Sequence, residues 1–303
     1  MSEPLPLPDA PPSAAEEVRK GALYAIAAYL WWGFSVFYFK AVAGVPPLEI
    51  MAHRVVWSVP LLFAWLAWRG RLADVRRAVS DRRTLAILLV TTALIAGNWL
   101  VFIIAVNSGR VTQASLGYYI NPLVNVLLGV VFLGERLRGM QIAGVLLATA
   151  GVAFLTVSYG ELPVISLFLA GTFALYGLLR KTVRADGMTG LAVETSLLLP
   201  LALGFLLVQE ARGGLAFVHG TWQETLLLPL GGLVTTLPLV WFANAVRRLR
   251  LATIGFIQYL SPSLQLLLAT AVFGEPFTRV HLVTFACIWL ALALYSLDAW
   301  RRR

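Results

Sequence analysis

Two apolar segments of this 303-residue chain, 114–133 and 251–273, each carry polar side chains on one helical face. A polar stripe that faced lipid would cost insertion energy, so both stripes should face the interior of a helix bundle. There they could form hydrogen bonds between helices, or they could line a cavity that binds a ligand. Each stripe has three members spaced i, i+3 and i+7, namely Tyr118, Asn121 and Asn125, and Gln258, Ser261 and Gln265.

Each stripe also contains a proline, Pro122 in the first and Pro262 in the second. A proline inside a helix removes one backbone hydrogen bond and exposes a carbonyl about one turn earlier. A neighbouring helix or a ligand could satisfy that carbonyl. Because stripe and proline occur together twice, the pattern favours a substrate cavity with two helix kinks over packing contacts alone.

Three ionisable residues lie inside apolar segments: His53 and Arg54 in 50–68, and Glu194 in 191–208. An unpaired charge at the bilayer centre costs about 2.5–3.5 kcal/mol, so each should have a partner or a water-filled cavity. Inverted halves would hold Arg54 and Glu194 at different depths, too far apart for an ion pair. If the protein is proton-coupled, we expect Glu194 to be the proton-sensitive group, with His53 the weaker candidate, whereas Arg54 could equally snorkel to the interface.

Aromatic side chains inside the apolar segments form a third group of candidates, because those beside polar residues could stack on a flat apolar substrate. Most of the ten tryptophans should be interfacial or packing residues. The remaining members of the predicted substrate cavity are Trp32, Asn98, Trp99, Tyr176, Trp241 and Asn244.

The composition requires an integral membrane protein. Hydrophobic residues make up 59% of the chain, and charged residues only 13%. A soluble protein could not bury so much apolar surface. Ten apolar stretches approach the ~20 residues that a membrane-spanning helix needs. They are 21–39, 50–68, 84–106, 114–133, 140–157, 162–179, 191–208, 225–246, 251–273 and 280–297.

The positive charges are distributed unevenly between the loops. With a cytoplasmic N-terminus, 19 of the 24 Lys and Arg residues fall on the cytoplasmic side, 4 fall on the other side, and Arg54 lies within a span. This bias predicts that both termini are cytoplasmic. Membrane topology therefore explains the net charge of +9, and no nucleic-acid partner is expected, although the basic clusters could touch anionic lipid.

The chain repeats on an offset of 140 residues, which relates Pro122 to Pro262. Two copies of five spans must insert with opposite orientation, as in many transporters. The predicted parts are a disordered tail over 1–18, a first repeat over 19–158, a second over 159–300 and a basic end over 301–303. The offset is only 138 before Tyr118, so we expect the helix to bend differently in the second copy.

Two smaller features suggest how the helices meet. Glu135 follows Gly134 at the end of an apolar segment, where its charge opposes the helix dipole, so it should have a partner such as Arg136 or Arg138. Gly274 and Glu275 form the corresponding corner of the second copy. A strip of small residues could pack against another helix or against a second copy in a homodimer; it comprises Gly144, Ala148 and Gly151.

The motifs together resemble the EamA-type drug/metabolite transporter superfamily, and most closely its RarD branch. The resemblance covers residues 19–300 approximately and is specific as a set, whereas each motif is weak alone. The matching segments are 52–57, 97–99, 105–107, 115–125, 133–136, 176–177, 180–181, 194–195, 235–236 and 248–251. It implies ten helices in two inverted EamA repeats, a central substrate cavity and a multi-pass location in the bacterial inner membrane.

The function expected from this resemblance is secondary transport, with efflux of a small organic metabolite or drug-like molecule by alternating access. An exporter of aromatic or neutral amino acids in the same superfamily is the alternative. Proton coupling stays open, because no acidic residue is expected deep in the midplane.

Two other functional classes fit the sequence less well. An intramembrane enzyme needs a zinc motif or an activated nucleophile, and neither pattern occurs. We therefore assign no catalytic residue, metal site or cofactor, and the single Cys287 allows no intrachain disulfide. A channel needs a ring of equivalent ligands, whereas an inverted repeat of unlike residues suits a binding site better.

Overall fold

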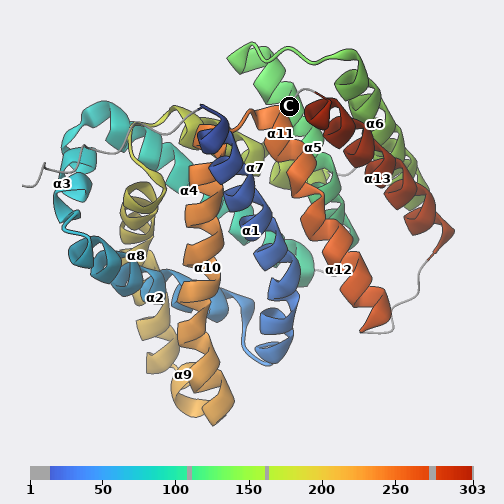
Figure 1. Ribbon diagram of the computed structural model, residues 1–303. Helices are drawn as coiled ribbons and strands as arrows, with labels where there is room; N and C mark the ends of the chain where they lie inside the picture. Colours follow the sequence, from blue (N-terminus) through green and yellow to red (C-terminus); the bar gives the residue numbers. More distant parts are fainter. Residues whose placement is uncertain (1–13, 108–110, 161–163, 273–277, 302–303) are drawn as a thin grey trace, which may run out of the picture.

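The computed structural model describes residues 14–107, 111–160, 164–272 and 278–301, and these form helices joined by short connections (Figure 1). Nine helices within these ranges are long and apolar enough to cross a membrane. The all-helical fold class is therefore confirmed, while ten spans in an inverted repeat with cytoplasmic termini stay a prediction. The nine helices are α1 (Ala14–Ala41), α2 (Pro47–Trp68), α4 (Arg82–Asn107), α5 (Val111–Leu133), α6 (Gly139–Tyr159), α7 (Val164–Thr182), α8 (Gly187–Ala211), α10 (Trp222–Arg248) and α13 (Arg279–Trp300).

The segment predicted as the ninth span is divided into α11 (Leu251–Gln258) and α12 (Leu260–Ala271) at Tyr259. Pro262 has no backbone N–H to donate to the carbonyl of Gln258, so the helical ladder is interrupted there. In contrast, α5 continues through Pro122 without a break. The different bend expected from the two-residue insertion is confirmed. The two remaining helices are the short connecting helices α3 (Leu72–Ser80) and α9 (Ala216–His219).

Several helix boundaries differ from the prediction by a few residues, among them the start of α1 and the end of α7. α1 begins at Ala14, so residues 14–18 are helical rather than part of a disordered tail, and two glutamates in the first turn suit the helix dipole. α7 continues to Thr182, so Arg180 and Lys181 lie in its last turn instead of a loop. Basic side chains are favourable at that end of a helix. Residues 1–13 and the Gly274–Glu275 corner lie outside the described residues.

Glu135 joins the end of α5 to the start of α11. Gly134 leaves the helix in the left-handed region, with φ of 63°, which an L side chain rarely adopts. The Glu135 carboxylate then accepts hydrogen bonds from the backbone N–H groups of Leu251 at 2.7 Å and Ala252 at 3.0 Å. Arg250 lies 3.8 Å from the same carboxylate. The partner is thus a helix N-terminus with Arg250, and the expectation of Arg136 or Arg138 is wrong.

Helices of the two predicted halves interleave. α1 and α2 both pack on α10, α5 packs on α7 and α11, and α6 packs on α13. The start of α1, the end of α10 and the end of α13 lie at the same end of the bundle (Figure 1). We call this end the terminal face, and the end where α9 lies the opposite face.

The strip of small residues on α6 packs against α13 of the same chain. A Cβ added at Gly144 would lie 3.1 Å from the carbonyl oxygen of Ala291, and one added at Gly151 would lie 2.8 Å from Cβ of Cys287. The small side chains therefore permit close helix packing. Because α13 of the same chain covers the strip, the strip is not available as a homodimer surface.

Candidate functional site

The amide side chains of the predicted stripes meet at the crossing of α5 and α11. Asn125 Nδ2 donates to Gln258 Oε1 at 2.8 Å and to Asn121 Oδ1 at 3.1 Å. Gln258 Nε2 also donates to Asn121 Oδ1, and the Tyr29 hydroxyl of α1 donates to Gln258 Oε1 at 3.3 Å. These four side chains, which we call the amide network, are at most 5% exposed. In this structure they bind one another between helices, as interhelical hydrogen bonds do in membranes.

The other members of the stripes lie apart from the amide network. Tyr118 is 43% exposed, and its ring packs edge-on against Phe102 of α4. Ser261 is buried on α12, and Gln265 Nε2 donates to the carbonyl oxygen of Trp32 at 3.3 Å. The break at Tyr259 separates the second stripe between Gln258 and Ser261, so the ideal helical spacing assumed from the sequence does not hold there.

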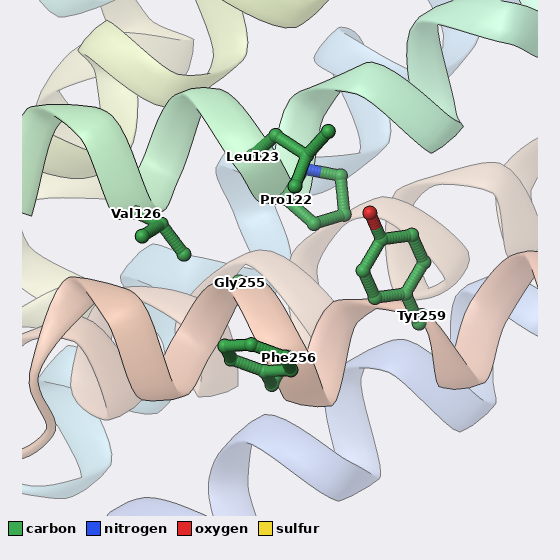
Figure 2. A pocket seen from close by; sticks show the side chains of 6 residues that line it. All are labelled: Pro122, Leu123, Val126, Gly255, Phe256 and Tyr259. Atoms are coloured by element: carbon green, nitrogen blue, oxygen red, sulfur yellow. The ribbon is translucent and has the colours of Figure 1, made fainter. Parts of the chain in front are cut away.

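The backbones of α5 and α11 approach closely beside the amide network. A Cβ added at Gly255 would lie only 2.5 Å from the carbonyl oxygen of Pro122, so only glycine fits this crossing. Figure 2 shows the residues around it, with Pro122 and Val126 of α5 facing Gly255, and with the Tyr259 hydroxyl directed toward α5. The crevice between them leaves no space for a water molecule. It is a packed contact and not a binding cavity.

Arg54 is held at the junction of α2, α10, α1 and α4. Its Nε donates to Thr235 Oγ1 of α10 at 2.7 Å. The guanidinium carbon lies 4.8 Å from the centre of the Trp99 ring and 5.5 Å from that of Phe39. No acidic side chain among the described residues forms an ion pair with Arg54. Two aromatic faces and one hydroxyl therefore stabilise the charge.

Glu194 has a different set of partners, buried between α4, α7 and α8. Its carboxylate accepts hydrogen bonds from the Thr91 hydroxyl at 2.5 Å and the Tyr176 hydroxyl at 3.2 Å. Arg180 Nη1 lies 3.6 Å away, and both charged side chains are almost fully buried. Arg180 also donates to the carbonyl oxygen of Gly187 at 3.0 Å. Arg54 and Glu194 thus have separate partners, as the expected difference in depth requires.

His53 lies against a buried carboxylate that the sequence analysis did not select. Its Nδ1 accepts a hydrogen bond from Trp57 Nε1 at 3.2 Å, and its Nε2 lies 3.8 Å from Glu49 Oε1. Glu49 is fully buried and accepts a hydrogen bond from the backbone N–H of Phe217 at 3.0 Å. The spacing of four residues between Glu49 and His53 was the available signal. It was missed because Glu49 lies just outside the predicted apolar segment.

The aromatic candidates pack either against other aromatic rings or against Arg54. Trp32 and Tyr176 both pack in a cluster of rings around Phe242, where Tyr176 and Phe242 stack with centres 6.1 Å apart. Trp241 packs edge-on against Trp31. Among these tryptophans and tyrosines, only Trp99 contacts a cationic side chain, that of Arg54.

The two asparagines predicted beside tryptophans form local hydrogen bonds. Asn98 Nδ2 donates to the carbonyl oxygen of Leu169 and to the Thr172 hydroxyl, each at 2.8 Å, and so ties α4 to α7. Asn244 Nδ2 donates to the carbonyl oxygen of Val240 within α10. The structure therefore does not collect the candidates into one cluster: it forms the amide network, the Arg54 group and the Glu194 group.

Comparisons with known proteins decide the family. Residues 19–157 match the EamA-like transporter family. An uncharacterized transporter of Vibrio cholerae is 47% identical, with the match covering 93% of this chain and 94% of that protein. The chain belongs to the EamA-like transporter family. It is accordingly a multi-pass membrane protein related to transporters.

Named relatives place this EamA transporter near RarD. Protein RarD of Escherichia coli is 43% identical over 94% of this chain and 96% of that protein. The chloramphenicol-sensitive protein RarD of Pseudomonas aeruginosa is 34% identical over 93% and 95%. The resemblance inferred from the motifs is confirmed. A solved crystal structure with 18% identity and a TM-score of 0.70 covers 94% of this chain and 99% of that one, which supports the fold alone.

Proposed function

We propose that this EamA transporter is a secondary carrier that exports a small organic molecule across the bacterial inner membrane by alternating access. The predicted halves, 19–158 and 159–300, would move against each other around the central residues. If the solute is to reach its site from each side of the membrane in turn, contacts between the halves must close one face while the other face is open. Contacts at the terminal face support this proposal.

Polar contacts between the predicted halves at the terminal face carry this proposal. The Glu135 carboxylate caps α11, and Arg250 donates to the carbonyl oxygen of Arg136 at 2.7 Å. Arg248 lies 2.9 Å from Glu17, which is in the first turn of α1 just before the first predicted half. We call these contacts, with the 2.6 Å ion pair of Arg71 and Asp186, the terminal latch.

Beneath the terminal latch, buried groups connect the helices further. Lys181 Nζ donates to the carbonyl oxygens of Val246 and Leu249, which ties the end of α7 to the end of α10. The amide network lies below, between α5 and α11. By contrast, Tyr118 on the other side of the amide network is 43% exposed. This difference supports the proposal of a carrier closed at the terminal face.

Solute counterflow in proteoliposomes tests the proposal. The full chain would be reconstituted and given radiolabelled chloramphenicol, tryptophan, indole-3-acetate or glucose, with and without the unlabelled solute inside. A carrier gives saturable uptake that is accelerated by solute on the far side, whereas a channel gives flux that rises linearly with concentration. Flux equal to that of empty liposomes for all four solutes would contradict transport of small organic molecules.

A further inference from the structure

We propose that the solute carries a carboxylate beside a flat apolar body and lacks a compensating ammonium group, and that Arg54 binds the carboxylate. This inference rests on the proposed carrier function and specifies its substrate class. It follows from three observations: Arg54 has no acidic partner, part of its guanidinium is unused, and the surrounding side chains are aromatic.

The charge of Arg54 is incompletely compensated within the protein. Its one hydrogen bond to a described residue is that of Nε to Thr235, so Nη1 and Nη2 have no hydrogen bond to any described residue. The other arginine inside the bundle, Arg180, has Glu194 and backbone carbonyls around it. An arginine within a membrane span normally pairs with an acid or with backbone carbonyls. A carboxylate on the solute would supply the missing partner, because the guanidinium fork binds carboxylates through two parallel hydrogen bonds.

The groups around Arg54 fit an apolar ring on the same solute. The Trp99 and Phe39 rings lie 4.8 and 5.5 Å from the guanidinium carbon, and half-exposed Tyr118 lies within electrostatic range. The Tyr38 hydroxyl has no hydrogen-bond partner among the described residues, and a Cβ added at Gly231 would lie 2.6 Å from it. Gly231 thus keeps room for a polar atom beside Arg54.

Among the described residues, no carboxylate forms an ion pair with Arg54, so the site has no observed counter-ion for an ammonium group on the solute. The nearest acid in sequence, Glu49, accepts a hydrogen bond from the backbone of Phe217 and lies against His53. A zwitterionic amino acid would therefore leave its ammonium group uncompensated in a region of low dielectric. An organic monoanion would not have this cost.

Binding of four matched indoles to the purified full chain tests the proposal. The probes are indole-3-acetate (anionic), tryptophol (neutral), tryptamine (cationic) and tryptophan (zwitterionic), followed by thermal unfolding at increasing concentration. We expect indole-3-acetate to raise the unfolding temperature most. Arg54→Gln should weaken that binding by about 10- to 100-fold, since a hydrogen bond to a charged group is lost, while Arg54→Lys should weaken it less.

Two further variants keep the test decisive. Thr235→Val retains the guanidinium but removes its anchor, and should weaken indole-3-acetate binding even if Arg54→Gln fails to fold. Arg279→Gln, at an exposed arginine away from this site, should bind as the wild type does. Equal stabilisation by tryptophol, unchanged binding in Arg54→Gln and Thr235→Val, or no stabilisation by any probe at millimolar concentration would each overturn the substrate class.

The counterflow assay separates this inference from the proposed function. Saturable counterflow of tryptamine or tryptophol without binding of indole-3-acetate would retain the carrier and overturn the substrate class. Arg54-dependent binding of indole-3-acetate without counterflow of that solute would support the anion site and contradict the carrier.

Discussion

The ionisable residues inside the bundle have three kinds of surroundings. Arg54 lies on aromatic rings, His53 lies against Glu49, and Glu194 is paired with Arg180 and bonded to hydroxyl groups. The cost of a charge in hydrocarbon predicted that partners exist, but not which ones. Hydropathy predicts a helix that ends at residue 179 and so places Arg180 in a loop, whereas α7 continues to Thr182. The spacing of four residues between Arg180 and Tyr176, another partner of Glu194, was the signal that could have identified Arg180.

Breaking the Arg180–Glu194 pair from one side should destabilise the protein strongly. Arg180→Met leaves the Glu194 carboxylate buried with only hydroxyl partners, which should lower the free energy of unfolding by about 3–5 kcal/mol. Thermal unfolding in detergent measures the loss. Arg184→Met is the matched control, because Arg184 is exposed after the same helix and should matter little. Equal unfolding temperatures for the two variants would show that the pair contributes nothing.

The ion pair of Asp186 should make the terminal face sensitive to acid. Burial opposes ionisation, but hydrogen bonds from Thr189 and the nearby Arg71 guanidinium hold the pKa of the Asp186 carboxyl below its usual value. A lowered folded-state pKa contributes stability above the unfolded value of about 3.9, and this is lost as pH falls through the folded-state pKa. Asp186→Asn should therefore unfold at a lower temperature than the wild type at pH 7, and the difference should shrink below about pH 4. A difference independent of pH would refute this account.

At the scale of elements, the crossing of α5 with α11 depends on the absence of a side chain at Gly255. Gly255→Ala would place a methyl group against the carbonyl oxygen of Pro122, and the overpacking should cost about 1–3 kcal/mol. Gly204→Ala in α8 is the control, since a Cβ there would meet nothing within 4 Å. Thermal unfolding should show a clear loss for the first variant and almost none for the second. Similar unfolding temperatures for Gly255→Ala and Gly204→Ala would mean that the helices can move apart at the Pro122 carbonyl without loss of stability.

The helices were predictable to different degrees. Eight apolar stretches correspond to helices within a few residues of their predicted ends, and the first corresponds to α1, which starts seven residues earlier than predicted. The agreement follows because hydropathy determines where a chain can span lipid. The break at Tyr259 was predictable only as a difference in bending, from the two-residue insertion before Pro262. The sequence could not predict which polar side chains of the two stripes would lie together. That depends on the orientation of α11 and α12 relative to α5.

At the scale of the whole molecule, the terminal latch joins the predicted halves through side chains far apart in sequence. Motif spacing was sufficient to find the family, and the family implies transport. It was insufficient to find the latch, because Glu135 was expected to pair locally and instead caps α11. Short-range spacing cannot show such a contact, which depends on packing between the halves.

Reciprocal cysteine labelling tests alternating access most directly. In a Cys287→Ala background, one cysteine would replace Leu128, buried near the terminal latch, and in a second protein one would replace the half-exposed Tyr118. Adding Glu135→Gln weakens the latch, and should speed maleimide labelling at position 128 by about threefold to tenfold. Labelling at position 118 should slow in return. Glu224→Gln, which alters a glutamate that caps only its own helix, is the control.

The account predicts opposite changes at the two positions, because one face opens as the other closes. Faster labelling at both positions, or at position 128 alone, would contradict alternating access and indicate local loosening of the terminal latch.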